Sequence, residues 1–264
     1  MRTGEIFSWL DAEFPLYLQE KYDNAGGQVV FPEEDVSGIL FSLDLTPGVI
    51  REARDRGCNV IISHHPYFFR ALKKVDSSKA KSALLVELID QRISCYAVHT
   101  NYDKFMNRFI EKKLGLNHEK ILYRTDPGFE KDELGFGSIS FCSNEMRLKE
   151  LMDNIKDSLK VSFVLFSGDE DQKVQKIAIL NGSGGGAIPE IIDKHSVDCI
   201  LTGDVGHHSA RDALDAGVAV VDAGHYGTEK LMMEYLFEKV QGKLVNEKIS
   251  LYIAENENSP FRIY

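Results

Sequence analysis

Short apolar runs alternate with amphipathic stretches along this chain of 264 residues, and this alternation constrains the fold more than any other feature. Residues 38–45 (GILFSLDL), 59–63 (NVIIS) and 94–98 (SCYAV) have the composition of buried strands. Each is followed by a stretch whose apolar residues recur at helical spacing. Strands that alternate with helices are typical of a parallel or mixed sheet covered by helices. The sequence therefore predicts the α/β class.

The alternation is interrupted once, from about residue 121 to residue 133. This stretch is polar and contains Pro127 followed by Gly128, so we expect a linker or a domain boundary there. A second series of strands and helices then runs from residue 136 to a last strand at residues 249–255 (ISLYIAE). The chain is therefore expected to form two α/β units.

The charge balance restricts the partners of the protein. Lys and Arg number 31 against 41 Asp and Glu, a formal charge of −10, which argues against sequence-independent binding of nucleic acid. No segment approaches the roughly 20 apolar residues that span a bilayer, so we expect no membrane association. The four cysteines form no CxxC pair and lie in or beside apolar runs. We therefore expect buried free thiols and a cytoplasmic protein.

Most of the histidines lie where apolar strands end. Four segments, NVIISHHP, CYAVHTNYD, CILTGDVGHH and AVVDAGHYGTE, run from a strand into a polar turn. They contain six of the eight histidines: His64, His65, His99, His207, His208 and His225. In open α/β sheets, ligands bind outside the carboxyl ends of the strands. These histidines are therefore expected to form a functional site.

The first two histidines are neighbours in the chain. Adjacent residues on a strand point to opposite faces, so His64 and His65 serve one site only from a turn, or by binding two different metals. Pro66 restricts His65 to extended backbone geometry. The alternative is a surface loop with incidental histidines.

Two carboxylates are candidate ligands beside these histidines. Asp103 opens the next predicted helix, where it acts either as an N-cap or as a ligand near the histidine pair. His99 either binds metal or hydrogen-bonds a neighbouring group. His225 and Glu229 are four residues apart and share one face of a helix, a good pair for a divalent ion. The alternative is a solvent-facing hydrogen bond between them.

The candidate ligands are His64, His65, Asp103, His225 and Glu229. All five offer nitrogen or oxygen, and they are more than one tetrahedral ion needs. Two divalent ions about 3.5 Å apart, sharing a carboxylate and a water, fit better. Such a pair generates hydroxide near neutral pH and binds phosphoryl oxygens. The donor atoms admit Zn, Mn, Fe, Ni or Mg.

Other motifs are less specific. The loop NGSGGG at residues 181–186 either cradles a phosphate or is a tight turn with positive φ, which we favour slightly. His207 and His208 act as general acid or base, line a cavity, or form a surface pair at a helix start. Asp23 precedes Asn24 and a glycine pair, which is typical of a turn. Asp44 ends a strand and could support a ligand.

Seven motifs, taken in order, resemble the Nif-three-like dinuclear-metal family, whose members are called GTP cyclohydrolase I type-two homologues. They are YDNAGGQ, SLDLT, SHHP, HTNYD, NGSGGG, TGDVGHH and GHYGTE, and the resemblance runs over essentially the whole chain. The family often has Trp at the position of Tyr22 and Leu at that of Gly27.

The resemblance implies two α/β domains, one inserted in the other, in a toroidal homohexamer built as a trimer of dimers. The metal-binding domain would be residues 1–125 plus 225–264, and the inserted domain residues 126–224. The five candidate ligands carry over unchanged, and the metal sites would face an internal cavity.

We therefore expect a metal-dependent hydrolase acting on a nucleotide or phosphorylated small molecule, with His207 or His208 as proton shuttle. Two divalent ions would add +4 and invert the local charge, so an acidic protein can accept an anionic substrate. The alternative is a non-enzymatic metal-binding scaffold or regulatory adaptor.

Overall fold

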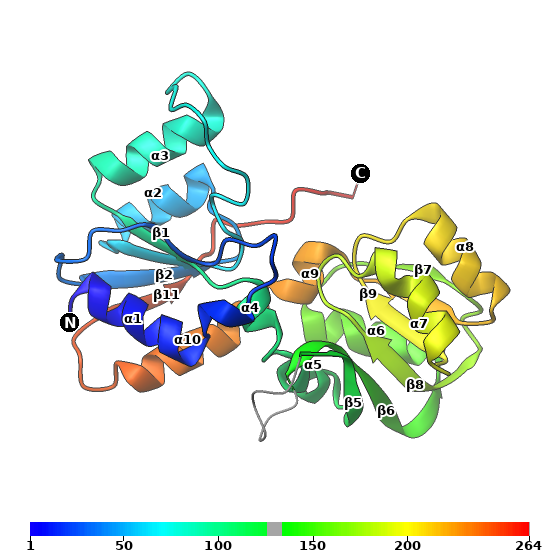
Figure 1. The fold of residues 1–264 in the computed structure, drawn as a ribbon. Helices are drawn as coiled ribbons and strands as arrows, with labels where there is room; N and C mark the ends of the chain where they lie inside the picture. The colour runs from blue at the N-terminus through cyan, green and yellow to red at the C-terminus, as the bar shows by residue number, and fades with distance from the viewer. Residues whose placement is uncertain (126–133, 264) are drawn as a thin grey trace. The chain divides into compact units, whose positions relative to one another are not determined.

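Two separate sheets organise the chain in a computed structural model, which describes residues 1–125 and 134–263. Residues 1–102 together with 233–264 form one compact unit, and residues 103–232 form the other. The predicted linker with Pro127 and Gly128 falls on residues 126–133, outside the described residues. Both units combine helices with a sheet, so the predicted α/β class is confirmed (Figure 1).

The first unit is built on a five-stranded sheet. The strand order is β1 (Gly26–Val29), β4 (Ser94–Ala97), β3 (Val60–Ser63), β2 (Gly38–Ser42), β11 (Ser250–Ile253). Only β1 is antiparallel to its neighbour, so β2, β3 and β4 all end at the same edge. The three central strands are buried along their whole length, as their continuous apolar runs predict.

Helices cover both faces of this sheet (Figure 1). Helices α2 (Pro47–Asp55) and α3 (Ala80–Asp90) bury Val49, Ile50 and Leu88 in one cluster with strand residues. On the other face, α1 (Thr3–Glu13) and α10 (Met232–Lys243) contribute Phe7 and Phe237, whose rings pack on aromatic residues of the strands. Pro47 stands in the first turn of α2, where its fixed φ suits the start of a helix.

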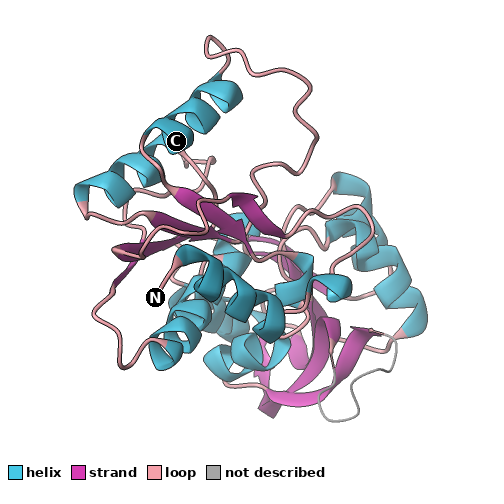
Figure 2. Cartoon of the chain, turned by 60° about the vertical axis from the view of Figure 1, so that its left-hand side comes forward, coloured by secondary structure: helices cyan, strands magenta, loops and turns pink. Residues whose placement is uncertain are grey.

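The second unit is built on a six-stranded sheet. The order is β5 (Asn117–Arg124), β6 (Gly135–Arg147), β8 (Lys173–Ile179), β9 (Cys199–Thr202), β10 (Ala219–Asp222), β7 (Leu165–Ser167). Strands β8, β9 and β10 are parallel, and the outer strands are antiparallel (magenta in Figure 2). Helices α7 (Ile188–Lys194) and α8 (His207–Asp215) pack on one face, and α6 (Leu148–Leu159) packs on β6 and β8.

One predicted boundary was wrong. We expected a polar linker from about residue 121, but β5 continues to Arg124 and pairs with β6. Only Ile121 and Leu122 of this strand are buried, so its sequence lacks a strong strand pattern. The compact units divide at residues 102/103 and 232/233, and β5 lies in the six-stranded sheet of the second unit.

The four cysteines are free and buried, which confirms the sequence expectation. Burial raises the pKa of the Cys58 thiol to about 11 and that of Cys95 to about 12. Thiols with such pKa values carry little thiolate at neutral pH and are unreactive. Within the described ranges, the helices are too short or too polar to cross a bilayer.

A buried carboxylate fixes α5 (Asn107–Leu114) to the sheet of the second unit. Glu111 is 2% exposed, and its Oε1 accepts hydrogen bonds from His118 Nδ1 on β5 (2.7 Å) and Ser140 Oγ on β6 (2.9 Å). One acidic side chain therefore ties a helix to two strands.

Replacing Glu111 by Ala should lower the free energy of unfolding by about 1–3 kcal/mol, because two buried donors lose their acceptor. Denaturant unfolding would measure this. Lys112→Ala, at the exposed neighbouring position, should change stability by no more than about 0.5 kcal/mol. Equal effects of the two substitutions would contradict the assigned role.

Candidate metal centre

The paired histidines of the first unit lie directly beyond the carboxyl end of β3. The His64 N–H donates to the Ser42 carbonyl (3.0 Å), and the His65 N–H donates to the Leu43 carbonyl (2.9 Å). The chain leaves the strand as a bend at these residues. The backbone thus holds both histidines at the edge where we expected them.

Three histidines of this unit form one group. The ligand nitrogens of His64, His65 and His99 all lie within 4.8 Å of one another. The ring centroid of His64 lies 5.0 Å from that of His65 and 5.2 Å from that of His99. Neighbouring residues reach the same place because they occupy a turn and not a strand. His99, which follows β4, was not among the five predicted ligands, although its motif left a metal-binding role open.

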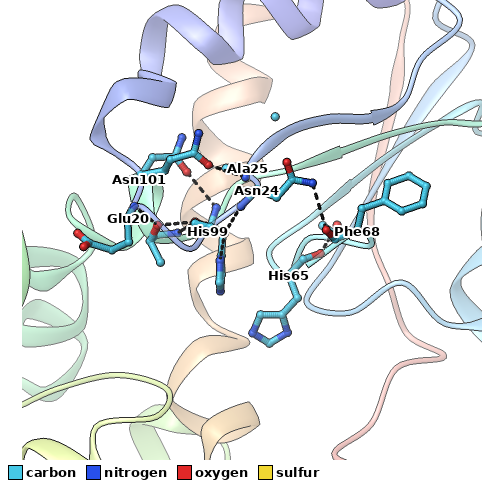
Figure 3. A network of polar contacts seen from close by, with 12 residues as sticks. Glu20, Asn24, Ala25, His65, Phe68, His99 and Asn101 are labelled. Atoms are coloured by element: carbon cyan, nitrogen blue, oxygen red, sulfur yellow. Dashed lines mark hydrogen bonds and ion pairs between the residues drawn. The ribbon is translucent and has the colours of Figure 1, made fainter. Parts of the chain in front are cut away.

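Two of these rings are held by carboxylates. His65 Nδ1 lies 2.8 Å from Asp44 Oδ1, and His99 Nδ1 lies 2.7 Å from Asp23 Oδ1. An ionised carboxylate only accepts hydrogen bonds, so Nδ1 carries the proton and Nε2 keeps its lone pair. This is the arrangement that metal-binding histidines use in proteins. Figure 3 shows His65 and His99 extending to the same side of the strands.

The Asp23 side chain is held in place by several hydrogen bonds. Its side chain has no exposed surface, and the Thr100 N–H and the Asn24 N–H donate to its two oxygens at 3.0 and 2.7 Å. Burial alone would raise the pKa of this carboxyl, but hydrogen bonds from His99, Thr100 and the Asn24 N–H lower the pKa to about 2. Asp23 therefore stays ionised at neutral pH and keeps His99 in one tautomer. The sequence indicated only a turn here, within the motif YDNAGGQ that is one of those shared with the family.

The second unit repeats this arrangement at the ends of β9 and β10. Helix α9 (His225–Glu229) begins just after β10, and His225 Nδ1 lies 2.8 Å from Asp204 Oδ2. Its Nε2 lies 3.0 Å from Glu229 Oε2, and Glu229 is only 5% exposed. The predicted shared helix face is therefore present, with the Glu229 side chain buried and the His225 side chain 34% exposed. Asp204 adopts φ of +56°, a conformation that is costly for a residue with a side chain.

The glycine loop supports this pair. The Gly182 N–H donates to Thr228 Oγ1 (2.9 Å), and φ at Gly182 is +64°. A Cβ atom at Gly182 would overlap Glu229 Oε1, and one at Gly184 would overlap Thr202 Oγ1. The loop is glycine-rich because it passes close to the candidate ligand, which favours the tight-turn interpretation over a phosphate cradle.

Three further residues were predicted to belong to the site: Asp103, His207 and His208. Asp103 ends α4 (Thr100–Asp103), and α5 begins only at Asn107, so Asp103 is not the N-cap of that helix. Its Oδ1 is buried. His207 and His208 are the first residues of α8, both exposed, with ring centroids 5.3 Å apart. This matches the surface-pair alternative, and their role as proton shuttle stays a prediction.

One residue of the site had no signal in the sequence. Glu257 accepts hydrogen bonds from the backbone N–H groups of Leu43 and Asp44, the turn that carries the partner of His65. Burial and the nearby Asp44 charge raise the pKa of Glu257, although the two N–H groups oppose this. The contact joins residues more than 200 positions apart, so spacing rules could not find it.

Known proteins resemble this chain in sequence and in fold. A GTP cyclohydrolase 1 type 2 homolog of Clostridium acetobutylicum is 34% identical over 267 residues, covering 99% of this chain and 98% of that protein. The crystal structure of a Staphylococcus aureus protein matches with a TM-score of 0.89 and 27% identity, over 100% of this chain and 99% of that one. A Bacillus cereus protein related to NIF3 shares the fold, with a TM-score of 0.91 and 24% identity over 100% and 99% of the two chains.

The family model Duf34/NIF3 (NGG1p interacting factor 3) matches residues 1–260. With nearly the whole chain matched, and with relatives aligned over their full length, the protein belongs to the Duf34/NIF3 family.

Proposed function

We propose that this protein is a metal-dependent hydrolase that acts on a nucleotide or another phosphorylated small molecule. The observation that carries the proposal is a repeated one: His65, His99 and His225 each have Nδ1 within 2.8 Å of an aspartate oxygen. The Nδ1 hydrogen bonds fix the orientation of each ring, and Nε2 of His225 lies 3.0 Å from Oε2 of Glu229, another proposed ligand. Histidines that bind metal in proteins are usually held by such a hydrogen bond.

The donor atoms fit divalent ions. The proposed ligands are His64, His65, Asp103, His225 and Glu229, to which the structure adds His99 as a candidate. Neutral imidazoles and carboxylates without thiolate suit Zn, Mn, Fe, Ni or Mg, and we propose two ions per chain. Such ions, when bound, polarise phosphoryl oxygens and lower the pKa of water. Two clostridial relatives are named GTP cyclohydrolase 1 type 2 homolog, which supports a nucleotide as one candidate substrate.

The protein's own residues have distinct parts in this proposal. Asp44, Asp23 and Asp204 hold the imidazoles of His65, His99 and His225 in orientation through Nδ1. Buried Glu229 supplies negative charge beside His225. His207 and His208, exposed at the start of α8, are proposed to move a proton to or from the substrate.

A second candidate is a non-enzymatic metal-binding scaffold or regulatory adaptor. The glycine loop favours it, because the loop packs against Glu229 and Thr202 and is not arranged as an open anion cradle. Such a protein would bind exchangeable metal tightly and turn over no substrate.

The Glu229→Gln substitution distinguishes these candidates. Loss of a charged ligand should lower metal affinity, and turnover of GTP or another phosphorylated substrate, by more than about 100-fold. Bound metal is measured by elemental mass spectrometry and turnover by product release. Glu238→Gln, at an exposed position of α10, is the matched control and should retain both properties. Equal turnover by wild type and Glu229→Gln would contradict the enzyme proposal, whereas full metal binding without turnover by wild type would support the scaffold.

Asp23 and Asp44 should affect metal binding through the histidines that they hold. Asp23→Asn and Asp44→Asn should each weaken metal binding about 10- to 100-fold, because the amide cannot hold the imidazole in the required tautomer. Isothermal titration with Zn²⁺ or Mn²⁺ measures the change. Asp55→Asn, an exposed position on α2, should leave the affinity unchanged. An unchanged affinity in the first two variants would show that His65 and His99 bind no metal.

We also propose that one domain is inserted in the other and that the chain assembles as a toroidal homohexamer, a trimer of dimers. Support comes from the resemblance carried by the ordered motifs. Sedimentation velocity should then give a mass six times the 29.7 kDa of one chain. A stable monomer or dimer at micromolar concentration would contradict the assembly.

A further inference from the structure

An exposed aromatic pair lies beside the histidine group of the first unit. Tyr22 is 66% exposed and Phe69 is 46% exposed, and their ring centroids are 6.3 Å apart at an interplanar angle of 72°. The Phe69 ring is also 5.9 Å from the ring of His99. Other aromatic residues of this chain are exposed, such as Tyr17 and Phe261. What distinguishes this pair is its contact with a candidate metal ligand.

Hydrogen bonds fix the two segments that carry these rings. Asn24 Nδ2 donates to the Phe68 carbonyl (3.2 Å), and the Phe68 N–H donates to Gln28 Oε1 (3.0 Å). Gln28 Nε2 in turn donates to the Asn24 carbonyl (2.7 Å), which closes the network (Figure 3). Tyr22 precedes the anchored Asp23, and Phe69 follows the anchored Phe68. The backbone that carries each ring is therefore held in place before any ligand binds, which reduces the entropy cost of binding.

We propose that Tyr22 and Phe69 form a stacking platform for the planar heteroaromatic ring of the ligand, the base of a nucleotide, next to the metal centre. Aromatic side chains stack on any base because every base has a π-face. The exposed cations Lys21 and Arg70 are the chain neighbours of the two rings and favour an anionic ligand. This inference rests on the proposed function and selects nucleotides from the wider class of phosphorylated small molecules.

Two ligands that differ only in the base test the platform. Guanosine 5′-monophosphate and ribose 5-phosphate share the sugar and the phosphate, so the base alone distinguishes them. On the metal-loaded full-length protein, Tyr22→Ala and Phe69→Ala should each raise the Kd of guanosine 5′-monophosphate about 10-fold, as expected for the loss of one stacking contact. The Kd of ribose 5-phosphate should stay within about twofold. Tyr22→Trp should retain nucleotide affinity, and Trp9→Ala, an aromatic truncation on α1 beside Lys243, is the control.

Tryptophan fluorescence tests the platform without truncating either aromatic side chain. Trp9 is the single tryptophan of the chain, so the Tyr22→Trp substitution in a Trp9→Phe background places one indole at the proposed platform. Guanosine 5′-monophosphate should change the emission of this indole in a saturable way, and ribose 5-phosphate should not.

The outcomes separate this inference from the proposed function. Discrimination between the two ligands that depends on Tyr22 and Phe69 supports the platform even if no substrate is turned over. Equal Kd values of the two ligands for wild type, or equal weakening of both in the alanine variants, would overturn it while leaving a hydrolase possible. A change of sedimentation in the alanine variants with unchanged ligand discrimination would identify the pair as a contact between copies of the chain, which also overturns the platform. Bound metal, measured in every variant, shows whether His99 has been disturbed.

Discussion

The hydrogen bond between an aspartate and the Nδ1 atom of a histidine is the interaction on which the candidate site depends. It occurs at His65, His99 and His225, each time where a strand gives way to a turn. The parallel strands place these residues at one edge within each sheet, and the aspartates fix the orientation of the imidazole rings. Burial of Asp23 and its several donors make the bond strong at His99. The sheets thus provide position, and the carboxylates provide the protonation state that a metal ligand requires.

Much of this could be predicted from the sequence because it is local. Continuous apolar runs predict β2, β3 and β4, and the polar residues that follow them predict the site. The spacing of His225 and Glu229 predicts their shared helix face. Contacts between distant segments could not be predicted. The buried part of β5 is only two residues long, and Glu257 reaches the turn of Asp44 from more than 200 residues away. The close packing of Gly182 on Glu229 likewise depends on the folded loop, although glycine enrichment indicated a special backbone there.

The segment YDNAGGQ holds two other parts of the site in position. Asp23 holds His99, while Asn24 and Gln28 hold the backbone of Phe68 in the segment that follows His65. The same network leaves the rings of Tyr22 and Phe69 exposed beside the histidines. A segment that first indicated only a turn therefore links the metal ligands to the surface on which we propose that a base stacks. Because this one segment holds both His99 and Phe68, its polar residues lie close together in the sequence.

Anomalous diffraction from crystals of the metal-loaded protein, recorded at the absorption edge of the bound metal, tests the central claim most directly. We expect two ions per chain, with Nε2 of the histidines and the carboxylates of Asp103 and Glu229 as ligands, and with Nδ1 of His65 and His225 still bonded to Asp44 and Asp204. Coordination through Nδ1, or ions bound away from these residues, or a metal-free site after loading, would contradict it.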